Sequence, residues 1–356
     1  MIHKDRKHLS LVSIIIPHWR GEEILLRGLR ALREHTGPNH EIILVDNGSD
    51  DGSITAAQRH FAGLRVVSTG NNLGFAGGCN FGMRAAAGEY FVLFNDDAVA
   101  TPHWLEPLIA MMESDARIAA CQPKILALDQ RGYFDYAGAC GGFIDFMGYP
   151  FCRGRIFTSL EKDQGQYDET ADVFWASGAC CLLRASVLAE VGLLDEYFFA
   201  HMEEIDLNWR MHLAGYRVMA VPASIVFHQA GSTLQAAAPR KTYLNHRNGL
   251  LLLLKNYPAA LLLWVFPLRL SLDFVETLRQ LFQRRAQHAF MIMRAAFSVC
   301  LKLPHLLAQR RQVQSLRKIS AWAVRGKLYR RSIVWDFFIL GRKKYSALPR
   351  HKGLRS

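Results

Sequence analysis

The stretch that decides the fold is Tyr90-Phe91-Val92-Leu93-Phe94-Asn95-Asp96-Asp97-Ala98. Its first five residues are aromatic or aliphatic and predict a buried strand, and two carboxylates follow almost at once. In an open α/β sheet, the carboxyl ends of parallel strands form the edge at which ligands bind. Because adjacent carboxylates repel each other, we expect a divalent cation that carries a phosphate to lie between them. The alternative is a polar turn that caps a helix beginning near Pro102.

Earlier segments repeat this pattern. Residues 11–16, 41–45 and 64–67 are predicted strands, and apolar positions recur at helical spacing over residues 24–32. Strands that alternate with helices through short connections predict a parallel sheet covered on both faces. The loop after the second strand, residues 46–53, is dense in short polar side chains and is predicted to be a turn.

The glycine pattern argues against two common nucleotide-binding classes. Residues 17–21 read Pro-His-Trp-Arg-Gly, where a dinucleotide-binding fold would place its glycine fingerprint, and the chain has no Gly-x-x-x-x-Gly-Lys loop. The glycine-rich stretch is instead residues 71–80, Asn-Asn-Leu-Gly-Phe-Ala-Gly-Gly-Cys-Asn, at the predicted start of a helix. Backbone amides there favour phosphate, with a plain tight turn as the alternative.

Charge is distributed unevenly along the 356 residues, half of which are hydrophobic. Residues 240–356 hold 24 Lys and Arg against 3 Asp and Glu, whereas residues 1–239 hold 19 against 28. We therefore expect the front to bind a cation and the back to meet a polyanion, either nucleic acid or an anionic membrane. The seven cysteines include no Cys-x-x-Cys pair and are predicted to be reduced core residues. The apolar run at residues 11–16 is too short for a signal peptide, so a cytoplasmic location is expected.

Four segments in order resemble motifs of family 2 glycosyltransferases, especially the rhamnosyltransferase-like branch. They are residues 13–17 (Ser-Ile-Ile-Ile-Pro), 45–49 (Val-Asp-Asn-Gly-Ser), 72–80 and 94–98. The resemblance covers roughly residues 9–250 and implies a Rossmann-like α/β fold of the GT-A type. It implies a catalytic domain over residues 1–240, with a nucleotide-sugar half (1–100) and an acceptor half (101–240). Residues 241–356 would follow as a basic, partly apolar, helical region associated with the membrane.

The resemblance also implies a set of donor-binding residues. The nucleotide sugar would be bound by Pro17, Asp46, Asn47, Ser49, Asn72, Gly74, Phe75, Ala76, Gly78, Asn80, Asn95 and Asp96. Asp97 and His228 would hold a divalent metal ion, Mg2+ or Mn2+. Many family members carry Asp where this chain has Asn95, and an amide hydrogen-bonds a ribose hydroxyl but binds metal less well.

The acceptor half has a looser pattern. Residues 118–172 are predicted to be an insertion on the acceptor side, whose aromatic rings suit sugars and whose Arg153 and Arg155 suit phosphate, unless they serve plain packing. Residues 173–183 are a predicted strand, with Trp175, Ser177 and Gly178 as expected acceptor or sugar contacts. Residues 217–222 and 224–227 are two further predicted strands.

An acidic cluster opens the next predicted helix. Glu203, Glu204 and Asp206 fall in its first turn, where acids also compensate the helix dipole by about 0.3–1 kcal/mol each. By the resemblance, Glu204 takes the place of the catalytic general base, with Glu203 and Asp206 beside it. Many members have Asp at this place.

The basic tail contains an apolar run at residues 259–268, about 16 Å long as a helix, whereas a bilayer core needs about 30 Å. It is too short to span, and Lys255, Pro258 and Pro267 interrupt any longer segment. Apolar residues at 274, 278, 281 and 282, beside arginines, predict a helix lying in the membrane interface. The alternative is a helix packed on the catalytic domain.

Together these features predict a metal-dependent, inverting glycosyltransferase peripheral to the cytoplasmic membrane face. It would move rhamnose or another deoxysugar from a nucleoside-diphosphate donor to a lipid-linked or polysaccharide acceptor, with an anionic inner membrane surface as partner and no nucleic acid. The rival hypothesis is a nucleic-acid-binding protein with a nucleotide-sensing front and a basic tail. The tail carries no recognised nucleic-acid motif, and long aliphatic runs interrupt its charges.

Overall fold

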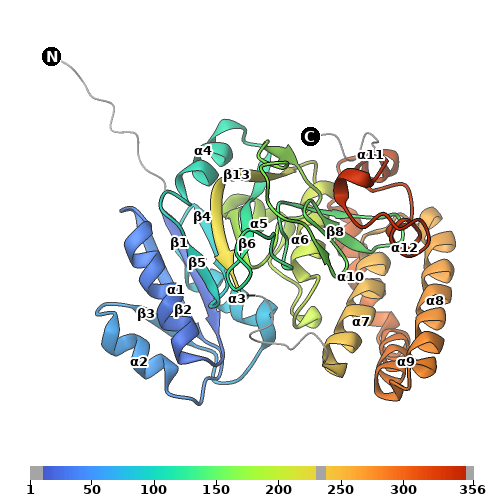
Figure 1. Ribbon diagram of the computed structural model, residues 1–356, viewed down its shortest axis with the longest axis horizontal. Helices are drawn as coiled ribbons and strands as arrows, with labels where there is room; N and C mark the ends of the chain where they lie inside the picture. The colour runs from blue at the N-terminus through green and yellow to red at the C-terminus, as the bar shows by residue number, and fades with distance from the viewer. Residues whose placement is uncertain (1–10, 230–237, 350–356) are drawn as a thin grey trace.

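The computed structural model describes residues 11–229 and 238–349, and a nine-stranded sheet forms its centre (Figure 1). The strand order is β11-β13-β6-β12-β4-β1-β2-β3, and β5 pairs with β13. The strands of the front half, β1 (Val12–His18), β2 (His40–Asp46), β3 (Arg65–Ser68) and β4 (Tyr90–Phe94), are parallel, as predicted. β12 (Cys180–Arg184) runs antiparallel to β4 and to β6 (Ile118–Ala127), so the sheet is mixed.

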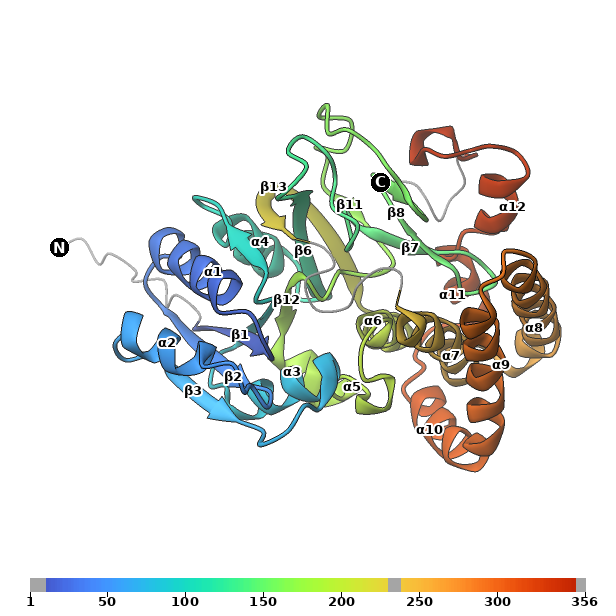
Figure 2. The same cartoon turned by 60° about the horizontal axis from the view of Figure 1, so that its bottom comes forward.

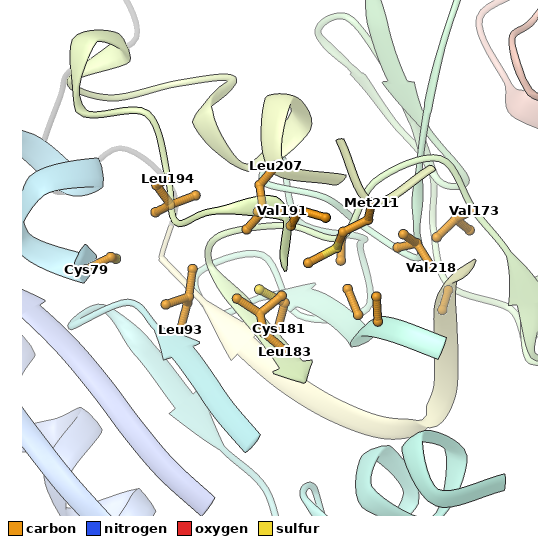
Figure 3. Close-up of a cluster of buried hydrophobic side chains, with 14 of the residues drawn as sticks. Cys79, Leu93, Val173, Cys181, Leu183, Val191, Leu194, Leu207, Met211 and Val218 are labelled. Atoms are coloured by element: carbon orange, nitrogen blue, oxygen red, sulfur yellow. The ribbon is translucent and has the colours of Figure 1, made fainter. Parts of the chain in front are cut away.

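Helices cover both faces of the sheet. α1 (Glu22–His35), α2 (Ser53–His60) and α4 (Glu106–Ser114) share one hydrophobic core with one face. α3 (Gly74–Ala85), α5 (Ala185–Val191) and α6 (Glu203–Leu213) pack on the opposite face. Figure 3 shows part of this second core, where Leu207 and Met211 of α6 lie over Cys181 of β12. Because α3 and α6 pack on the same face of the sheet, the glycine-rich start of α3 and the acidic start of α6 lie in the same layer.

Three predicted elements differ from the structure. Residues 118–127 are not part of an insertion but form β6, whose position between β12 and β13 makes it an almost wholly buried central strand. The segment that follows it forms a separate antiparallel sheet of β7 (Gly142–Ile144), β8 (Pro150–Cys152), β9 (Arg155–Ile156) and β10 (Ser159–Leu160). Of the predicted strand at residues 173–183, only residues 180–183 belong to a regular strand, which is β12.

The third difference concerns residues 217–228, which form one strand, β13 (Arg217–His228), instead of two. Its pairing with β6 shifts register between Val221 and Ile225. Pro222 lies in this shift, where a residue without a backbone N–H is tolerated. β13 also pairs, in the antiparallel direction, with β5 (Ala98–Ala100) and with β11 (Ala171–Asp172).

The helical region begins with α7 (Pro239–Asn256), which packs between α6 and the outer helices (Figure 2). α8 (Ala259–Phe282), α9 (Ala286–Leu301) and α10 (Leu303–Ser315) follow, then α11 (Ala321–Lys327) and α12 (Ile333–Phe338). Tyr329 and Phe337 pack into the same core as α3 and α6, and Tyr329 N donates to Ile144 O at 2.9 Å. Residues beyond 240 thus contribute side chains to the core of the α/β part, and the boundary at residue 240 stays a prediction.

The length and apolarity of the described helices decide whether any of them could span a membrane. α8 continues through Pro267, contrary to the expected interruption, because a proline removes one backbone bond without ending a helix whose other bonds persist. Among the described residues no single helix has the length and apolarity to cross a bilayer. Only α9 and α10 taken together have them, and they meet at an angle of 71°. All seven cysteines are free, and of these only Cys300 is exposed.

Candidate active site

The acidic triplet lies in a tight turn between β4 and β5. Ala98 N donates to Asn95 O at 3.1 Å and closes the turn, and Asn95 N donates to Ala179 O at 3.0 Å. The turn stands at the carboxyl end of β4, as predicted. It leads into β5 and does not cap a helix, since α4 begins only at Glu106.

Asp97 points to His228 at the end of β13. The Oδ1 atom of Asp97 lies 2.9 Å from Nε2 of His228, and the amide nitrogen of Asn95 lies 3.1 Å from the same Nε2. The other ring nitrogen, Nδ1, lies 2.9 Å from Oδ1 of Asp135. Burial disfavours a charged imidazole, but the neighbouring carboxylates of Asp97 and Asp135 raise the pKa of His228 to about 10. The carboxylates of Asp97 and Asp135 therefore stabilise a positive charge between them.

Asp135 is not among the site residues that were expected from the sequence. It lies in the aromatic run 133–136 and is 2% exposed. An isolated acid among aromatic residues gave no signal, because its histidine partner is contributed by a strand far along the chain. A carboxylate on the second nitrogen of a ligand histidine fixes the orientation of the ring.

These residues fit a divalent metal ion. A carboxylate oxygen and an imidazole nitrogen are ligand types that divalent metal ions use, and Asp97 Oδ1 and His228 Nε2 lie 2.9 Å apart. Within the described ranges no cluster of three or more His, Cys, Asp or Glu could hold a metal. Substrate phosphates and waters would have to complete the shell, as they commonly do for Mg2+.

Asp96 has a different partner. Its Oδ2 atom lies 2.6 Å from Nδ1 of His18, and Nε2 of His18 lies 2.8 Å from the hydroxyl of Ser53. Ser53 donates to Asp51 at 2.5 Å. Burial raises the pKa of Asp96, and the hydrogen bond with His18 opposes that rise. Asp96 and Asp97 thus each lie beside a histidine, and a divalent ion between the two acids stays a prediction. His18, at the end of β1, was also missed by the sequence reasoning.

The predicted donor motifs converge on the glycine-rich loop. A Cβ on Gly78 would lie 3.1 Å from both Pro17 Cβ and Asn47 Nδ2, so these three motifs meet at one point. Asn47 donates to Gly74 O at 3.0 Å and accepts from Leu73 N at 3.0 Å. Asn47 thus shapes the loop from within instead of facing solvent.

The remaining donor residues stand around this point. Asn72 Oδ1 accepts from Gly74 N at 2.8 Å, and Gly74 has a φ of 73°. Asp46, at the end of β2, accepts from Ser49 N at 2.8 Å and from the Ser68 hydroxyl at 3.0 Å. Asp46 is half-buried at the carboxyl end of β2, and its contact with the nucleotide stays a prediction.

Four predicted contact residues are instead bound to protein groups. Asn80 donates to Leu194 O at 2.8 Å and accepts from Leu194 N at 3.1 Å. Trp175 donates to Phe143 O at 2.9 Å, and the Ser177 hydroxyl donates to Ala137 O at 2.9 Å. Because these side chains are buried and their polar atoms are satisfied, they hold the site together and do not face a substrate.

Asp206 is the fourth of these residues and corrects the expectation that it lies beside the base. Its carboxylate accepts from Lys255 at 2.9 Å, Arg210 at 3.0 Å and Asn256 at 2.8 Å. Burial alone would raise the pKa of Asp206, but the charges of Lys255 and Arg210 lower it. Asp206 therefore joins α6 to α7 as a fully ionised group.

Glu203 and Glu204, the first residues of α6, have a different environment. Within the described residues, the Oε2 atom of each is buried without a hydrogen-bond partner. Burial raises the pKa of Glu203 well above its usual range, and the charge of Glu204 adds to this rise. Burial also raises the pKa of Glu204, to about 7. A carboxylate that titrates near neutrality and has one oxygen without a partner is suited to accept a proton.

Gly178 brings the two halves of the site together beside Glu204. A Cβ at this glycine would lie 2.9 Å from Cε1 of Phe75 in the glycine-rich loop and 4.0 Å from Cβ of Glu204. Only a residue without a side chain allows this approach. Gly178 was predicted as a sugar contact, and the structure places it between the donor loop and the acidic helix.

Positive charge lies near the same carboxylate. Arg155 lies 4.7 Å and Lys241 5.3 Å from the centre of the Tyr136 ring. Arg155 is buried, and its Nε has no hydrogen-bond partner among the described residues. Its charge lowers the pKa of Glu204 slightly against the effect of burial.

The chain is similar in sequence to known glycosyltransferases. The chain is 31% identical over 225 residues to N-acetylglucosaminyl-diphospho-decaprenol L-rhamnosyltransferase of Mycobacterium tuberculosis, covering 59% of this chain and 73% of that protein. It is 29% identical over 226 residues to the rhamnosyltransferase WbbL of Escherichia coli, covering 61% and 82%.

Solved structures share the fold at low identity. GalNAc-T7, solved with UDP, GalNAc and Mn2+, has a TM-score of 0.55 at 17% identity over 69% of this chain and 48% of that one. The mannosyltransferase PcManGT from Pyrobaculum calidifontis, solved with GDP-Man and Mn2+, has a TM-score of 0.51 at 13% identity over 87% and 86%. The predicted α/β fold with C-terminal helices is confirmed. The model of glycosyl transferase family 2 matches residues 13–192, and the chain belongs to this family of glycosyltransferases.

Proposed function

We propose that this glycosyltransferase moves rhamnose or another deoxysugar from a nucleoside-diphosphate donor to a lipid-linked glycan, with inversion. The observation that carries the proposal is Glu204, a half-buried residue whose Oε2 atom is buried without a hydrogen-bond partner among the described residues and which lies next to the donor loop across Gly178. The sugar and the acceptor class follow from the similarity to rhamnosyltransferases, one of which is named for a diphospho-decaprenol acceptor.

In the proposed reaction, Glu204 takes the proton of the acceptor hydroxyl as its oxygen attacks the anomeric carbon. The bond between that carbon and the diphosphate oxygen breaks in the same displacement, which inverts the anomeric centre. Glu203 stays protonated because of its raised pKa, so the base does not face a second negative charge. Lys241, which is partly exposed, supplies positive charge for a substrate phosphate.

A divalent ion, Mg2+ or Mn2+, would be held by Asp97 and His228. The meeting of their side chains where β5 pairs with the end of β13 supports this assignment, as do the Mn2+ complexes of the two solved neighbours. Such an ion supplies positive charge for the departing diphosphate. Asp135 would keep the His228 ring in place through Nδ1.

A membrane surface is the proposed second partner because the polarity of α8 is inverted. Its buried side is polar and includes Arg269, Asp273, Thr277 and Gln280. Its outer side is apolar: Trp264 is 81% exposed, Phe274 63% and Phe282 95%. A helix in a water-soluble domain has the opposite arrangement.

α9 extends this apolar side, and cations surround it. Phe290 and Phe297 are exposed, as are Arg284, Arg285 and Lys302. Aromatic and aliphatic side chains beside cations suit the boundary of an anionic bilayer better than they suit duplex nucleic acid. We therefore propose that the enzyme binds peripherally to the cytoplasmic face of the membrane.

The function is tested by incubating the protein with a panel of nucleotide sugars, a polyprenyl-diphosphate-linked sugar acceptor, and Mg2+, Mn2+ or EDTA. Mass spectrometry of the lipid fraction should show the acceptor extended by one sugar, and EDTA should prevent this. A protein that extends the acceptor from none of the donors would contradict the proposal. Sedimentation with anionic vesicles and with duplex DNA separates the membrane partner from the nucleic-acid alternative.

A further inference from the structure

The segment immediately before the catalytic acids has an uncommon backbone. Phe199, His201 and Met202 have φ angles of 65°, 70° and 71°, although none of them is glycine. Side chains disfavour this left-handed region, and residues remain in it only when their surroundings hold them there. Met202 directly precedes Glu203, so the conformation of this catalytic loop, residues 197–202, sets where Glu203 and Glu204 stand.

Two buried side chains of α7 hold the loop. The Asn248 amide nitrogen lies 3.1 Å from Phe198 O, 2.9 Å from Ala200 O and 2.6 Å from His201 O. Arg247 donates to Tyr197 O at 2.9 Å and to Phe198 O at 2.8 Å.

The orientation of the amide is itself fixed. Arg247 Nε donates to Asn248 Oδ1 at 2.9 Å, so the amino group of Asn248 faces the loop carbonyls. Asn248 is fully buried and Arg247 is 8% exposed. The loop therefore depends on α7 for partners that its own residues do not supply.

The other side of the loop contacts the donor half. Phe199 O accepts from Ala76 N at 3.1 Å, and a Cβ on Gly74 would lie 2.4 Å from the same oxygen. The catalytic loop thus fits directly against the glycine-rich loop. A change in the path of residues 197–202 would move the acids relative to the donor that the glycine-rich loop holds.

We propose that Asn248, oriented by Arg247, is a positioning residue that sets the place of the general base through the catalytic loop. The inference rests on the proposed function, because it takes Glu204 as the base. It assigns a catalytic role to a helix that the sequence placed in the membrane-associated tail. Neither residue touches the reacting atoms; both act through backbone carbonyls of the loop.

The test compares Asn248→Asp and Asn248→Ala with Leu253→Ala. Aspartate keeps the size of asparagine but turns an acceptor toward the carbonyls. Leu253 is a fully buried residue of the same helix that packs on Gly148 instead of the loop. Arg247→Lys keeps a cationic donor and serves as the conservative variant. Thermal unfolding of each variant records its loss of stability.

Both Asn248 variants should lower kcat about 10- to 100-fold with donor KM changed less than about threefold, since small misplacements of catalytic groups have effects of this size. Hydrogen exchange of amides 197–204 should accelerate. Arg247→Lys should retain more of kcat than Arg247→Ala, and Leu253→Ala should keep kcat despite a lower Tm.

An Asn248→Ala protein with unchanged kcat and unchanged exchange would overturn the inference. A Leu253→Ala protein that loses as much kcat would do so as well, because a general loss of stability would then explain the effect. Exchange is measured without substrate, so it reports on the loop even if the wild-type protein transfers no sugar. In that event the proposed function fails separately.

Discussion

Nε2 of His228 lies 2.9 Å from Oδ1 of Asp97, and the pairing of β13 with β5 explains why residues so distant in sequence meet. The register places His228 opposite Ala98, directly after the acidic turn. The candidate metal site is therefore built where the end of β13 meets the turn that leads into β5.

Asp97→Ala should abolish the metal-dependent part of donor binding, because it removes the anionic ligand. Asn95→Ala should cost less, about tenfold or below, because a neutral amide contributes little to holding a divalent ion. Calorimetric titration of the nucleotide sugar with and without Mn2+ measures both. Equal losses from the two variants would show that Asn95 matters as much as the carboxylate.

Asp135→Asn should lower the affinity for Mn2+ about 10- to 100-fold, the usual effect of losing a carboxylate behind a ligand histidine. The variant keeps the shape of the side chain, so the fold should persist. Direct titration with Mn2+ is the measurement, and Asp163→Asn, at a carboxylate that pairs with Lys124, is the control. Unchanged affinity would mean that His228 does not bind the ion.

Gly178→Ala should weaken donor binding, because the new Cβ would lie 2.9 Å from the Phe75 ring and displace the donor loop. We expect KM for the nucleotide sugar to rise about tenfold. Gly37→Ala is the control, because Gly37 has open space around it and an ordinary φ. Gly52 also has open space, but its positive φ would strain an alanine. If Gly178→Ala leaves donor KM at the level of Gly37→Ala, the contact between the halves has no role in binding.

The front of the site was predictable from the sequence, since β1 to β4, the acidic turn and the glycine-rich loop are local in the chain. Their strands are apolar runs, and their polar residues follow each strand directly. Histidine partners were harder to predict. His18 is buried on β1 and meets Asp96 only because β1 and β4 are neighbours in the sheet.

The acceptor half was less predictable for a physical reason. β6 carries alanine, cysteine, glutamine, proline and lysine where β-branched residues usually mark a strand, and burial between two neighbours keeps it extended. The role of Asp206 was missed because its partners Lys255 and Asn256 lie on α7, which the sequence assigned to a separate region.

Trp264→Glu combined with Phe274→Glu should release the protein from anionic vesicles, because both residues lie on the apolar side of α8. Gln287→Glu is the control for the added charge, since Gln287 is exposed and polar. Sedimentation with vesicles at low and high salt is the measurement. High salt should weaken binding of the wild-type protein without abolishing it. A double variant that still sediments like the control would contradict the proposed membrane contact.

Glu204→Gln should raise the Tm at pH 8 and have little effect at pH 4. The folded protein raises the pKa of Glu204 from 4.5 to about 7, so the stability linked to its protonated form is present below pH 4.5 and lost as the pH rises toward 7. Glutamine keeps a neutral group at all pH values. Thermal unfolding from pH 4 to pH 8 measures this, and a pH-independent difference would show that the pKa is not raised.

The most direct test of the account is the rate of sugar transfer by Glu204→Gln beside its donor affinity. The change keeps the shape of the side chain and removes only the base, so transfer should fall at least about 1,000-fold while the donor Kd changes less than about threefold. The wild-type rate should rise with pH and level off above about pH 7, as Glu204 loses its proton. Substantial transfer by Glu204→Gln, with the wild-type dependence on pH, would contradict the assignment of Glu204 as the base.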